Sequence, residues 1–246
     1  RVLGHTEPVS YADFLRQRLE ITYFAATCLI PRSAALEFLQ PRQRAKDLAI
    51  EDFRDAFGVT HDFAAIRFTN LATSHLDLPV HYLRVNEDGA LFKGYENDGV
   101  TFTADVTGAI EGQPVCRHWA ARAAFARRTR TTEFHQYTDT PKGTFWCSTQ
   151  TGATDSGEFS ITLGVPFAHA KWFRGRETKR RAASTCPEES CCRLPDDALS
   201  ERWQQASWPS AVSHAQILGP LPSGRFPGVD DTEVYHFLEA NAPEPE

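Results

Sequence analysis

The sequence predicts an α+β fold, with a helical N-terminal part followed by a small antiparallel sheet and a cysteine-rich C-terminal segment. Over residues 11–76 apolar side chains recur at helical spacing, whereas from residue 80 they alternate with polar ones, as in half-buried strands. This change of period divides the 246 residues into a helical part, 1–79, and a strand-rich part, 80–246.

The first two helices are predicted from apolar spacing and from prolines. A helix over 11–30 ends at Pro31, because proline cannot continue a helix. Cys28 lies on its apolar side and is expected in the core. Ser33 is expected to cap a second helix that runs to about residue 49 and is interrupted by Pro41.

Residues 50–71 have the pattern of a helix-turn-helix. A helix over 50–57 is followed by Gly58, and Thr60 is placed to cap a second helix. One interpretation is DNA binding through a module at 50–76, and the other is a helical pair used only for packing. We favour packing, because the second helix offers one arginine, Arg67, to a phosphate backbone that binds several cations.

The strand-rich part begins with a hairpin over 80–95 that turns at Asp88-Gly89. Helical spacing returns over 114–128. Alternation then predicts strands at 131–137, 143–150 and 158–165, and a last short helix is expected at 229–240. The run from Lys171 to Arg181 is strongly basic, which suits either a phosphate-rich ligand or a solvated linker.

Composition and missing motifs exclude several classes of protein. The net charge of −6 is unlike that of a nucleic-acid-binding chain, and no apolar run reaches the ~18 residues of a membrane span. No signal peptide is recognisable, so we expect a cytoplasmic protein without a membrane partner. The sequence contains neither the paired histidines of a metalloprotease helix, nor a glycine-rich phosphate-binding loop, nor the nucleophile elbow of a serine hydrolase. We therefore expect that the protein is not an enzyme. Because the chain starts with Arg1 and has no methionine, we expect a piece of a longer protein.

Cysteine spacing is the strongest chemical signal. Three of the six cysteines, Cys186, Cys191 and Cys192, fall within seven residues, and in a reducing compartment such thiolates favour a soft metal. The alternatives are a vicinal disulfide or free thiols. Cys116 is a candidate fourth ligand, because a [4Fe–4S] cluster takes four thiolates. Cys147, within an apolar strand, is expected in the core.

The order of these elements resembles a known family. The chain resembles the actinobacterial regulators of short-chain fatty acyl-CoA metabolism. The resemblance rests on five features in order: a Tyr23–Pro31 helix, Phe53-x-x-x-Phe57-Gly58, the 80–95 hairpin, Cys116-x-x-Trp119 and a terminal cysteine block. These regulators join an ImmA/IrrE-like domain to a cysteine-cluster domain, and the likeness is strongest to their propionate-catabolism (methylcitrate cycle) branch. The block here, Cys-x-x-x-x-Cys-Cys, departs from the family's Cys-x-x-Cys spacing.

The resemblance implies the effector domain of a transcriptional activator. It would hold an iron–sulfur cluster, expected to be [4Fe–4S], on Cys116, Cys186, Cys191 and Cys192, and would bind coenzyme A or a short-chain acyl-CoA such as propionyl-CoA. Promoter DNA would be bound by a helix-turn-helix outside this chain, in a homo-oligomer. Because coenzyme A carries phosphates and an adenine, candidate contacts are cations and aromatics: Arg84, Lys93, Tyr95, Arg117, Trp119, Arg122, Lys171, Arg174 and Arg176. A divergent zinc metallohydrolase is the alternative.

Overall fold

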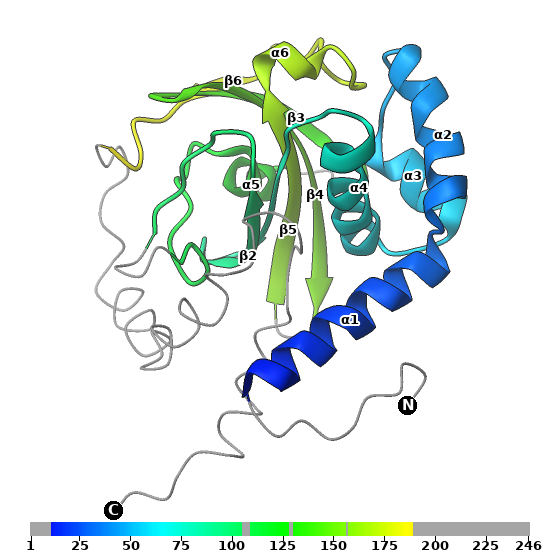
Figure 1. Ribbon diagram of the computed structural model, residues 1–246. Helices are drawn as coiled ribbons and strands as arrows, with labels where there is room; N and C mark the ends of the chain where they lie inside the picture. The colour runs from blue at the N-terminus through cyan, green and yellow to red at the C-terminus, as the bar shows by residue number, and fades with distance from the viewer. Residues whose placement is uncertain (1–10, 105–108, 128–129, 156, 189–246) are drawn as a thin grey trace, which may run out of the picture.

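A computed structural model describes residues 11–104, 109–127, 130–155 and 157–188. Figure 1 shows helices packed on both faces of one twisted sheet. In chain order the elements are α1 (Tyr11–Leu29), α2 (Arg32–Arg44), α3 (Ile50–Phe57), α4 (His61–His75), β1 (His81–Asn86), β2 (Leu91–Glu96), α5 (Ala120–Ala123), the 3₁₀ turn η1 (Ala124–Ala126), β3 (Phe134–Thr140), β4 (Gly143–Thr154), β5 (Gly157–Pro166), α6 (Phe167–Ala170) and β6 (Arg181–Ala183).

The six described strands form one sheet in the order β2-β1-β5-β4-β3-β6. All neighbours are antiparallel except β3 and β6, which run parallel. The architecture is α+β, as predicted. None of the helices in the described ranges combines the length and the apolar character that crossing a bilayer requires.

One face of the sheet is covered by helices α2, α3 and α4. Phe53 of α3 and Phe68 of α4 are fully buried there, and they meet Trp146 of β4 and Phe173 of the loop after α6 in one core. Phe68 packs edge-on against Phe173, with ring centroids 5.9 Å apart. Aromatic side chains thus join the helical part to the sheet.

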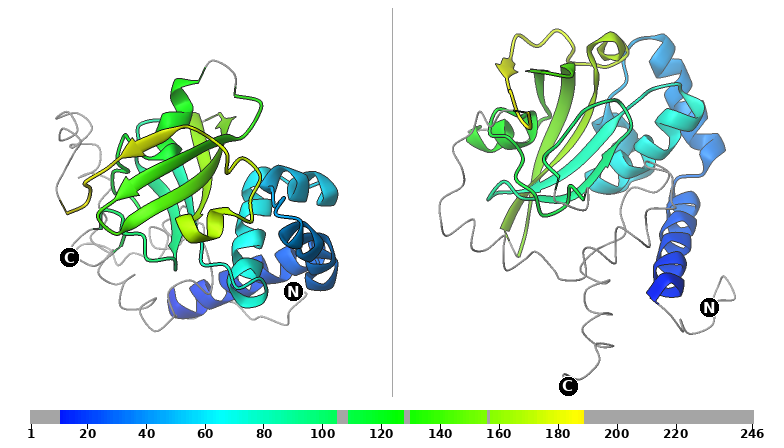
Figure 2. Two further views of the ribbon diagram at one scale, coloured as in Figure 1. Left: turned by 90° about the horizontal axis from the view of Figure 1, so that it is seen from above. Right: turned by 60° about the vertical axis from the view of Figure 1, so that its left-hand side comes forward.

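The opposite face carries a second core. Because strand side chains alternate, Tyr82 joins the helical face while its neighbours Leu83 and Val85 join this one. Here the sheet is covered by α5, η1 and the segments on either side of residues 105–108, with Trp119 near the centre. The two views of Figure 2 show α5 and the α2–α4 helices on opposite sides of the sheet.

The predicted α3–α4 turn is confirmed in detail. Gly58 ends α3 with a left-handed φ of 62°, a conformation that glycine adopts without strain. The Thr60 hydroxyl accepts the Phe63 N–H at 3.2 Å and so caps α4. The end of α3 and the start of α4 are therefore both defined by residues of this turn.

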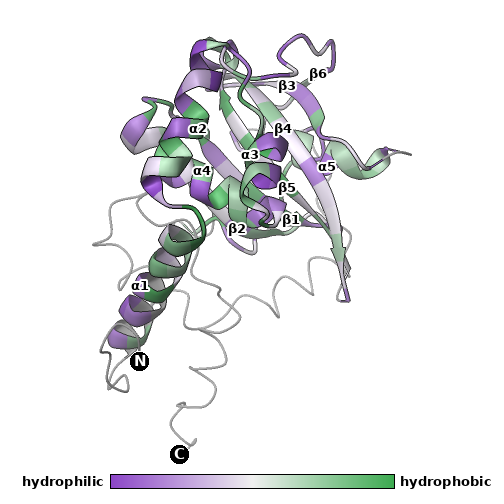
Figure 3. Cartoon of the chain, turned by 90° about the vertical axis from the view of Figure 1, so that its right-hand side faces the viewer, coloured by the Kyte–Doolittle hydropathy of each residue, from purple (hydrophilic) through white to green (hydrophobic). Residues whose placement is uncertain are grey.

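Three details of the N-terminal helices were predicted wrongly. Pro31, not Ser33, occupies the N-cap of α2, and the helix passes through Pro41 before it ends at Arg44. Cys28 is exposed, because much of α1 stands away from the sheet, as Figure 3 shows. Apolar spacing correctly predicted the helix, but burial also needs a partner element, and the described chain does not bring one to this side of α1.

The strand-rich part, 80–246, also differs from the prediction. The helix expected over 114–128 is limited to α5 and η1, since Pro114 forms a β-bridge with Ala90 and a turn precedes α5. Strand β6 was not predicted, because Arg-Ala-Ala within a basic run has no recognisable alternation. The helix expected at 229–240 lies outside the described residues.

Candidate functional site

Two cysteines that are distant in sequence meet at one pocket. Cys116 lies in the turn before α5, and Cys186 follows β6 by three residues. The pocket holds about 10 Å³, room for about one water molecule. It is lined by Thr101, Phe102, Thr103, Pro114, Val115, Cys116, Trp119, Ser184, Cys186 and Pro187. Two of the four predicted thiol ligands therefore line one pocket.

Ser184 connects the two cysteines. Its hydroxyl donates to Cys116 Sγ at 3.2 Å and accepts the Cys186 N–H at 3.2 Å. Its own N–H donates to the Asp139 carbonyl at 2.8 Å, which fixes the side chain relative to the sheet. Because Ser184 is nearly fully buried, water does not compete with these bonds.

Strand β6 carries Ser184 and Cys186 to this place. It pairs with β3 and is fastened by Arg181, whose guanidinium donates to both carboxylate oxygens of Asp139, each at 2.7 Å. The Arg181 hydrogen bonds, together with one from Thr144, lower the pKa of Asp139. A two-oxygen arginine clamp has a definite geometry, so it helps to orient β6, but Arg181 is 55% exposed and the backbone pairing with β3 holds the strand as well.

The turn that carries Cys116 is anchored to the β1–β2 hairpin. Val115 N–H donates to the Gly89 carbonyl at 2.9 Å, and the Arg122 guanidinium donates back to the Val115 carbonyl at 3.2 Å. The Cys116 carbonyl accepts the Trp119 N–H at 2.9 Å, which closes the turn. Backbone hydrogen bonds therefore position this thiol.

The other two predicted ligands, Cys191 and Cys192, lie outside the described residues. Within the described ranges no group of three or more His, Cys, Asp or Glu side chains is arranged to hold a metal. The donors that the pocket does offer are two thiols, which suit soft metals such as iron in a cluster or zinc. Cys147 is buried in β4, as predicted.

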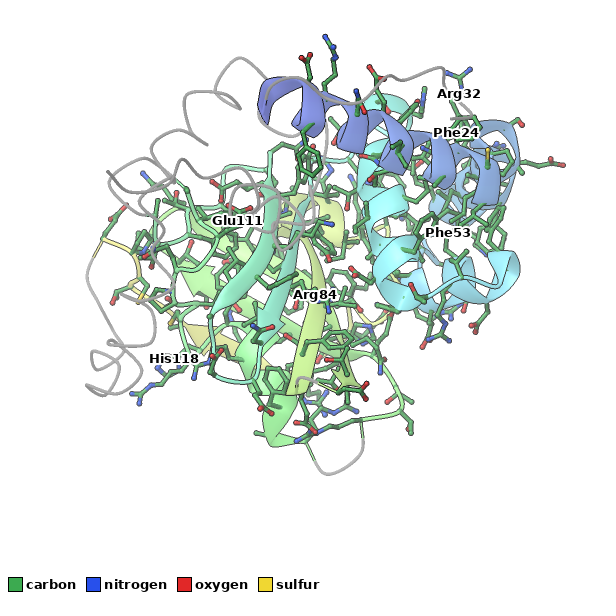
Figure 4. The ribbon with its side chains drawn as sticks, turned by 90° about the horizontal axis from the view of Figure 1, so that it is seen from below. Phe24, Arg32, Phe53, Arg84, Glu111 and His118 are labelled. Atoms are coloured by element: carbon green, nitrogen blue, oxygen red, sulfur yellow. The ribbon has the colours of Figure 1, made fainter. Side chains whose placement is uncertain are left out.

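The nine residues predicted to contact acyl-CoA lie in three places. Arg84, Lys93 and Tyr95 are on β1 and β2; Arg117, Trp119 and Arg122 are in or beside α5; and Lys171, Arg174 and Arg176 follow α6. In Figure 4, Arg84 lies at the sheet, and His118, next to Arg117, lies far from the α3 helix marked by Phe53. Of the nine, Trp119 alone lines the pocket with the cysteines.

Several of these cations already have protein partners. Arg174 donates to both Asp47 and Asp52, with distances of 2.7–2.9 Å, and so ties the loop after α6 to α3 and to the turn before it. The guanidinium of Arg84 pairs with Asp62 at 3.3 Å and lies near the rings of Phe92 and Phe159. Arg117 and Lys171 are exposed.

The helical pair α3–α4 is used for packing. Arg67, which the DNA-binding interpretation needs on the surface, is 2% exposed and donates to the Ile30 carbonyl at 3.1 Å. Ala64, Phe68 and Leu71 of the same helix are buried against the sheet and its neighbours. The helix that would enter a DNA groove is therefore part of the core.

Sequence reasoning missed two buried polar groups. Glu133 Oε2 lies 3.4 Å from His135 Nε2, while Glu133 Oε1 accepts the Glu51 N–H at 3.1 Å and lies 4.0 Å from His61 Nε2. Burial opposes ionisation of Glu133, but the His135 hydrogen bond and the His61 charge outweigh it and lower the pKa of this carboxyl. No spacing along the chain relates these residues.

The second group is His81 with Asp98 and Cys147. His81 Nδ1 is 2.7 Å from Asp98 Oδ2, and Cys147 Sγ is 3.5 Å from His81 Nε2. Gly164 was the available sequence signal, since a glycine inside a strand often marks the close approach of another group. Here that group is the His81 ring.

Comparison with known proteins gives a likeness of fold. The chain matches no protein-family model, and no curated protein matches it. A solved structure of a Mycobacterium tuberculosis transcriptional regulator is similar, with a TM-score of 0.50 and 19% identity over 65% of this chain and 50% of that one. At this identity the likeness concerns the fold. This chain spans about half the length of that regulator.

Proposed function

We propose that this chain is the effector-sensing part of a transcriptional regulator, and that it holds an iron–sulfur cluster and binds a short-chain acyl-CoA. The single observation that supports it most is the meeting of Cys116, the candidate fourth ligand, with Cys186 at one pocket across about seventy residues of sequence. The fold likeness to a transcriptional regulator supports the regulatory part.

The two thiols at the pocket are of the type that a cluster takes, although the pocket would have to widen to admit one. Cys116 and Cys186 would be two of its ligands, with Cys191 and Cys192 the other two, because Cys186 leads into them within a few residues. A [4Fe–4S] cluster with four thiolates would join the turn before α5 to the segment after β6, either as a structural cross-link or as a redox-sensitive one. Ser184 would donate to the Cys116 sulfur, and hydrogen bonds of this kind tune the potential of a cluster.

The cluster would couple the ligand region to the helical part. The segment before β6 begins near Arg174, which donates hydrogen bonds to Asp47 and Asp52 in the helical part. This segment therefore connects the cysteine pocket to the helices. A change at the thiols would shift the docking of β6, and through this segment it would bias two arrangements of the helices. In this proposal the helical part of the chain is ImmA/IrrE-like. The protein would form a homo-oligomer and would bind promoter DNA through a segment outside this chain.

The test of the cluster is the visible absorption of anaerobically purified protein, with iron, sulfide and zinc measured on the same sample. We expect brown protein containing iron and labile sulfide, bleached by Cys186→Ala and by Cys116→Ala. Cys28→Ala is the matched control, since Cys28 is exposed on α1 and should leave the colour unchanged. Colourless protein with stoichiometric zinc would instead favour the metallohydrolase alternative, and absence of both metals would refute a metal site.

The acyl-CoA part is tested separately by calorimetric titration with propionyl-CoA and with free coenzyme A. We expect the contact to lie near the cysteine pocket, where Trp119 and the exposed Arg117 are close in sequence. Arg117→Ala should weaken binding through loss of a phosphate contact. Arg32→Ala, an exposed cation at the start of α2 that is not among the candidate contacts, is the control. Equal affinity in wild type and Arg117→Ala would move the proposed site elsewhere.

A further inference from the structure

Three neighbouring strands place a histidine beside a cysteine inside the protein. In the register of the sheet, His81 of β1 is opposite Gly164 of β5, and Gly164 is opposite Cys147 of β4. A Cβ atom on Gly164 would come within 2.0 Å of His81 Nε2. The imidazole therefore lies across the glycine and reaches Cys147 on the far side of β5.

A third residue orients the histidine. Asp98, in the segment after β2, accepts from His81 Nδ1 at 2.7 Å, and its other oxygen accepts the Val100 N–H at 3.2 Å. The side chains of His81 and Asp98 are fully buried. Burial alone would lower the pKa of His81, but Asp98 and the Cys147 contact outweigh it and raise the pKa to about 10. At neutral pH His81 Nε2 thus carries a proton toward Cys147 Sγ, 3.5 Å away.

This arrangement has the three parts of an activated thiol. A nucleophile lies within reach of a histidine, and the histidine is held by a carboxylate. An imidazolium beside a cysteine favours the thiolate, which is the reactive form. A buried ion pair of this kind contributes little to stability compared with apolar packing, so its presence invites a chemical role.

A wall of two aromatic side chains separates this group from the cysteine pocket. Phe102 and Trp119 both contact the His81 ring, with centroids 5.7 and 5.8 Å apart, and both line the pocket. Among the described residues that line the pocket none carries a charge, and three are hydroxyl-bearing: Thr101, Thr103 and Ser184. The lining is uncharged and mostly apolar, which suits a neutral acyl group, but the pocket has room for about one water molecule, so such a group enters only when Phe102 and Trp119 move apart.

We propose that Cys147, His81 and Asp98 form a masked nucleophilic site, and that Cys147 accepts an acyl group from a small activated acyl compound, such as a short thioester, that enters past Phe102 and Trp119. The site would act once per molecule, as an acyl acceptor. It goes beyond the proposed effector binding and does not depend on the cluster.

The reaction balances with the groups present. The Cys147 thiolate forms a bond to the thioester carbonyl carbon, and the carbon–sulfur bond of the thioester breaks. The leaving thiolate takes the proton carried by His81 Nε2, so that a free thiol and S-acyl Cys147 are the products. Asp98 holds the imidazole throughout, and no oxidant or reductant is needed.

The test incubates the full chain, as purified and again after chelation of metal, with the N-acetylcysteamine thioester of propionate, and follows acylation by mass spectrometry of peptides. We expect one propionyl group on Cys147. Phe102→Ala, which opens the wall, should accelerate acylation of Cys147 several-fold. Asp98→Asn, which leaves the shape but removes the charge that orients His81, should slow it by roughly 10²-fold or more.

Exposed Cys28 in the same digest reports ordinary thiol reactivity, and its rate should be equal in all variants. Far-ultraviolet circular dichroism checks that Asp98→Asn folds. The inference is overturned if Cys147 stays unmodified in the wild type and in Phe102→Ala, or if Asp98→Asn reacts as fast as the wild type. Neither result bears on metal content or on propionyl-CoA affinity, so the proposed function is tested apart from it.

Discussion

At the scale of single residues, the sheet accepts only glycine at position 164. The His81 ring occupies the place of a side chain there, and any Cβ would meet it at 2.0 Å. The close approach of the His81 ring to Gly164 accompanies a fully buried His81–Asp98 pair. Local pattern could not predict the group, because its members come from β1, β4 and the segment after β2, and only the strand register joins them.

We therefore expect Gly164→Ala to lower the free energy of unfolding by about 1–3 kcal/mol, the usual cost of overpacking a well-filled core. Urea denaturation followed by circular dichroism measures it. Gly94→Ala is the matched control in β2, since its Cβ would meet the end of the Ile110 side chain at 2.6 Å, which can move. An equal cost for both variants would contradict a rigid His81.

Arg174 is a second residue with a measurable role. Its two-carboxylate clamp joins the loop after α6 to α3, but the side chain is 40% exposed, so solvent weakens the pairs. Arg174→Ala should cost about 1 kcal/mol at neutral pH. Arg54→Ala, which breaks a hydrogen-bonded pair with the adjacent Asp55, is the control and should cost less.

The same pair predicts a pH dependence. The Arg174 hydrogen bond lowers the pKa of Asp47 below its ordinary value of 3.8. A lowered folded-state pKa contributes stability above 3.8 that is lost as the pH falls through the lowered value. The stability difference between wild type and Arg174→Ala, measured in urea from neutral pH downward, should therefore shrink below 3.8. A constant difference would show that the Asp47 pair contributes nothing.

At the scale of elements, helix caps and turns were predictable from the sequence, whereas the packing of one element against another was not. Thr60 and Gly58 act through their immediate neighbours, so the α3–α4 turn could be derived from the sequence. The strand β6 depends on Arg181 meeting Asp139 forty-two residues away, which no local pattern encodes. Cys116 was a candidate fourth ligand because a [4Fe–4S] cluster takes four thiolates, and the structure brings it to the pocket of Cys186.

If β6 positions Cys186, loosening it should expose that thiol. Arg181→Ala removes both hydrogen bonds to Asp139, so we expect faster alkylation of Cys186 by iodoacetamide in metal-free protein. Cys28 in the same sample should react at an unchanged rate, since it is exposed on α1, which lies on the far side of the molecule from β6 in Figure 1. If Cys186 reacts equally fast in both proteins, the clamp does not control the cysteine pocket.

At the scale of the whole molecule, one sheet serves two cores. Neighbouring residues of β1 point to opposite faces, with Tyr82 in the helical core and Val85 in the core around Trp119. The change of pattern near residue 79 correctly separates helices from most strands, but α4 packs on strands that follow it in the chain. A pattern along the sequence reports which elements form, whereas the shared core depends on how they fold back on one another.

This sharing predicts a single cooperative unfolding of the described region. Phe68→Ala in the helical core should cost about 3–5 kcal/mol, and Val85→Ala in the opposite core should cost about 2–4 kcal/mol. Each variant should shift the helical circular dichroism signal and the tryptophan fluorescence signal to the same lower urea midpoint, because the strands belong to both cores. Separate midpoints for the two signals, with each variant moving only one, would show that 1–79 and 80–246 unfold as independent units and that the aromatic contacts of Phe53, Phe68 and Phe173 do not couple them.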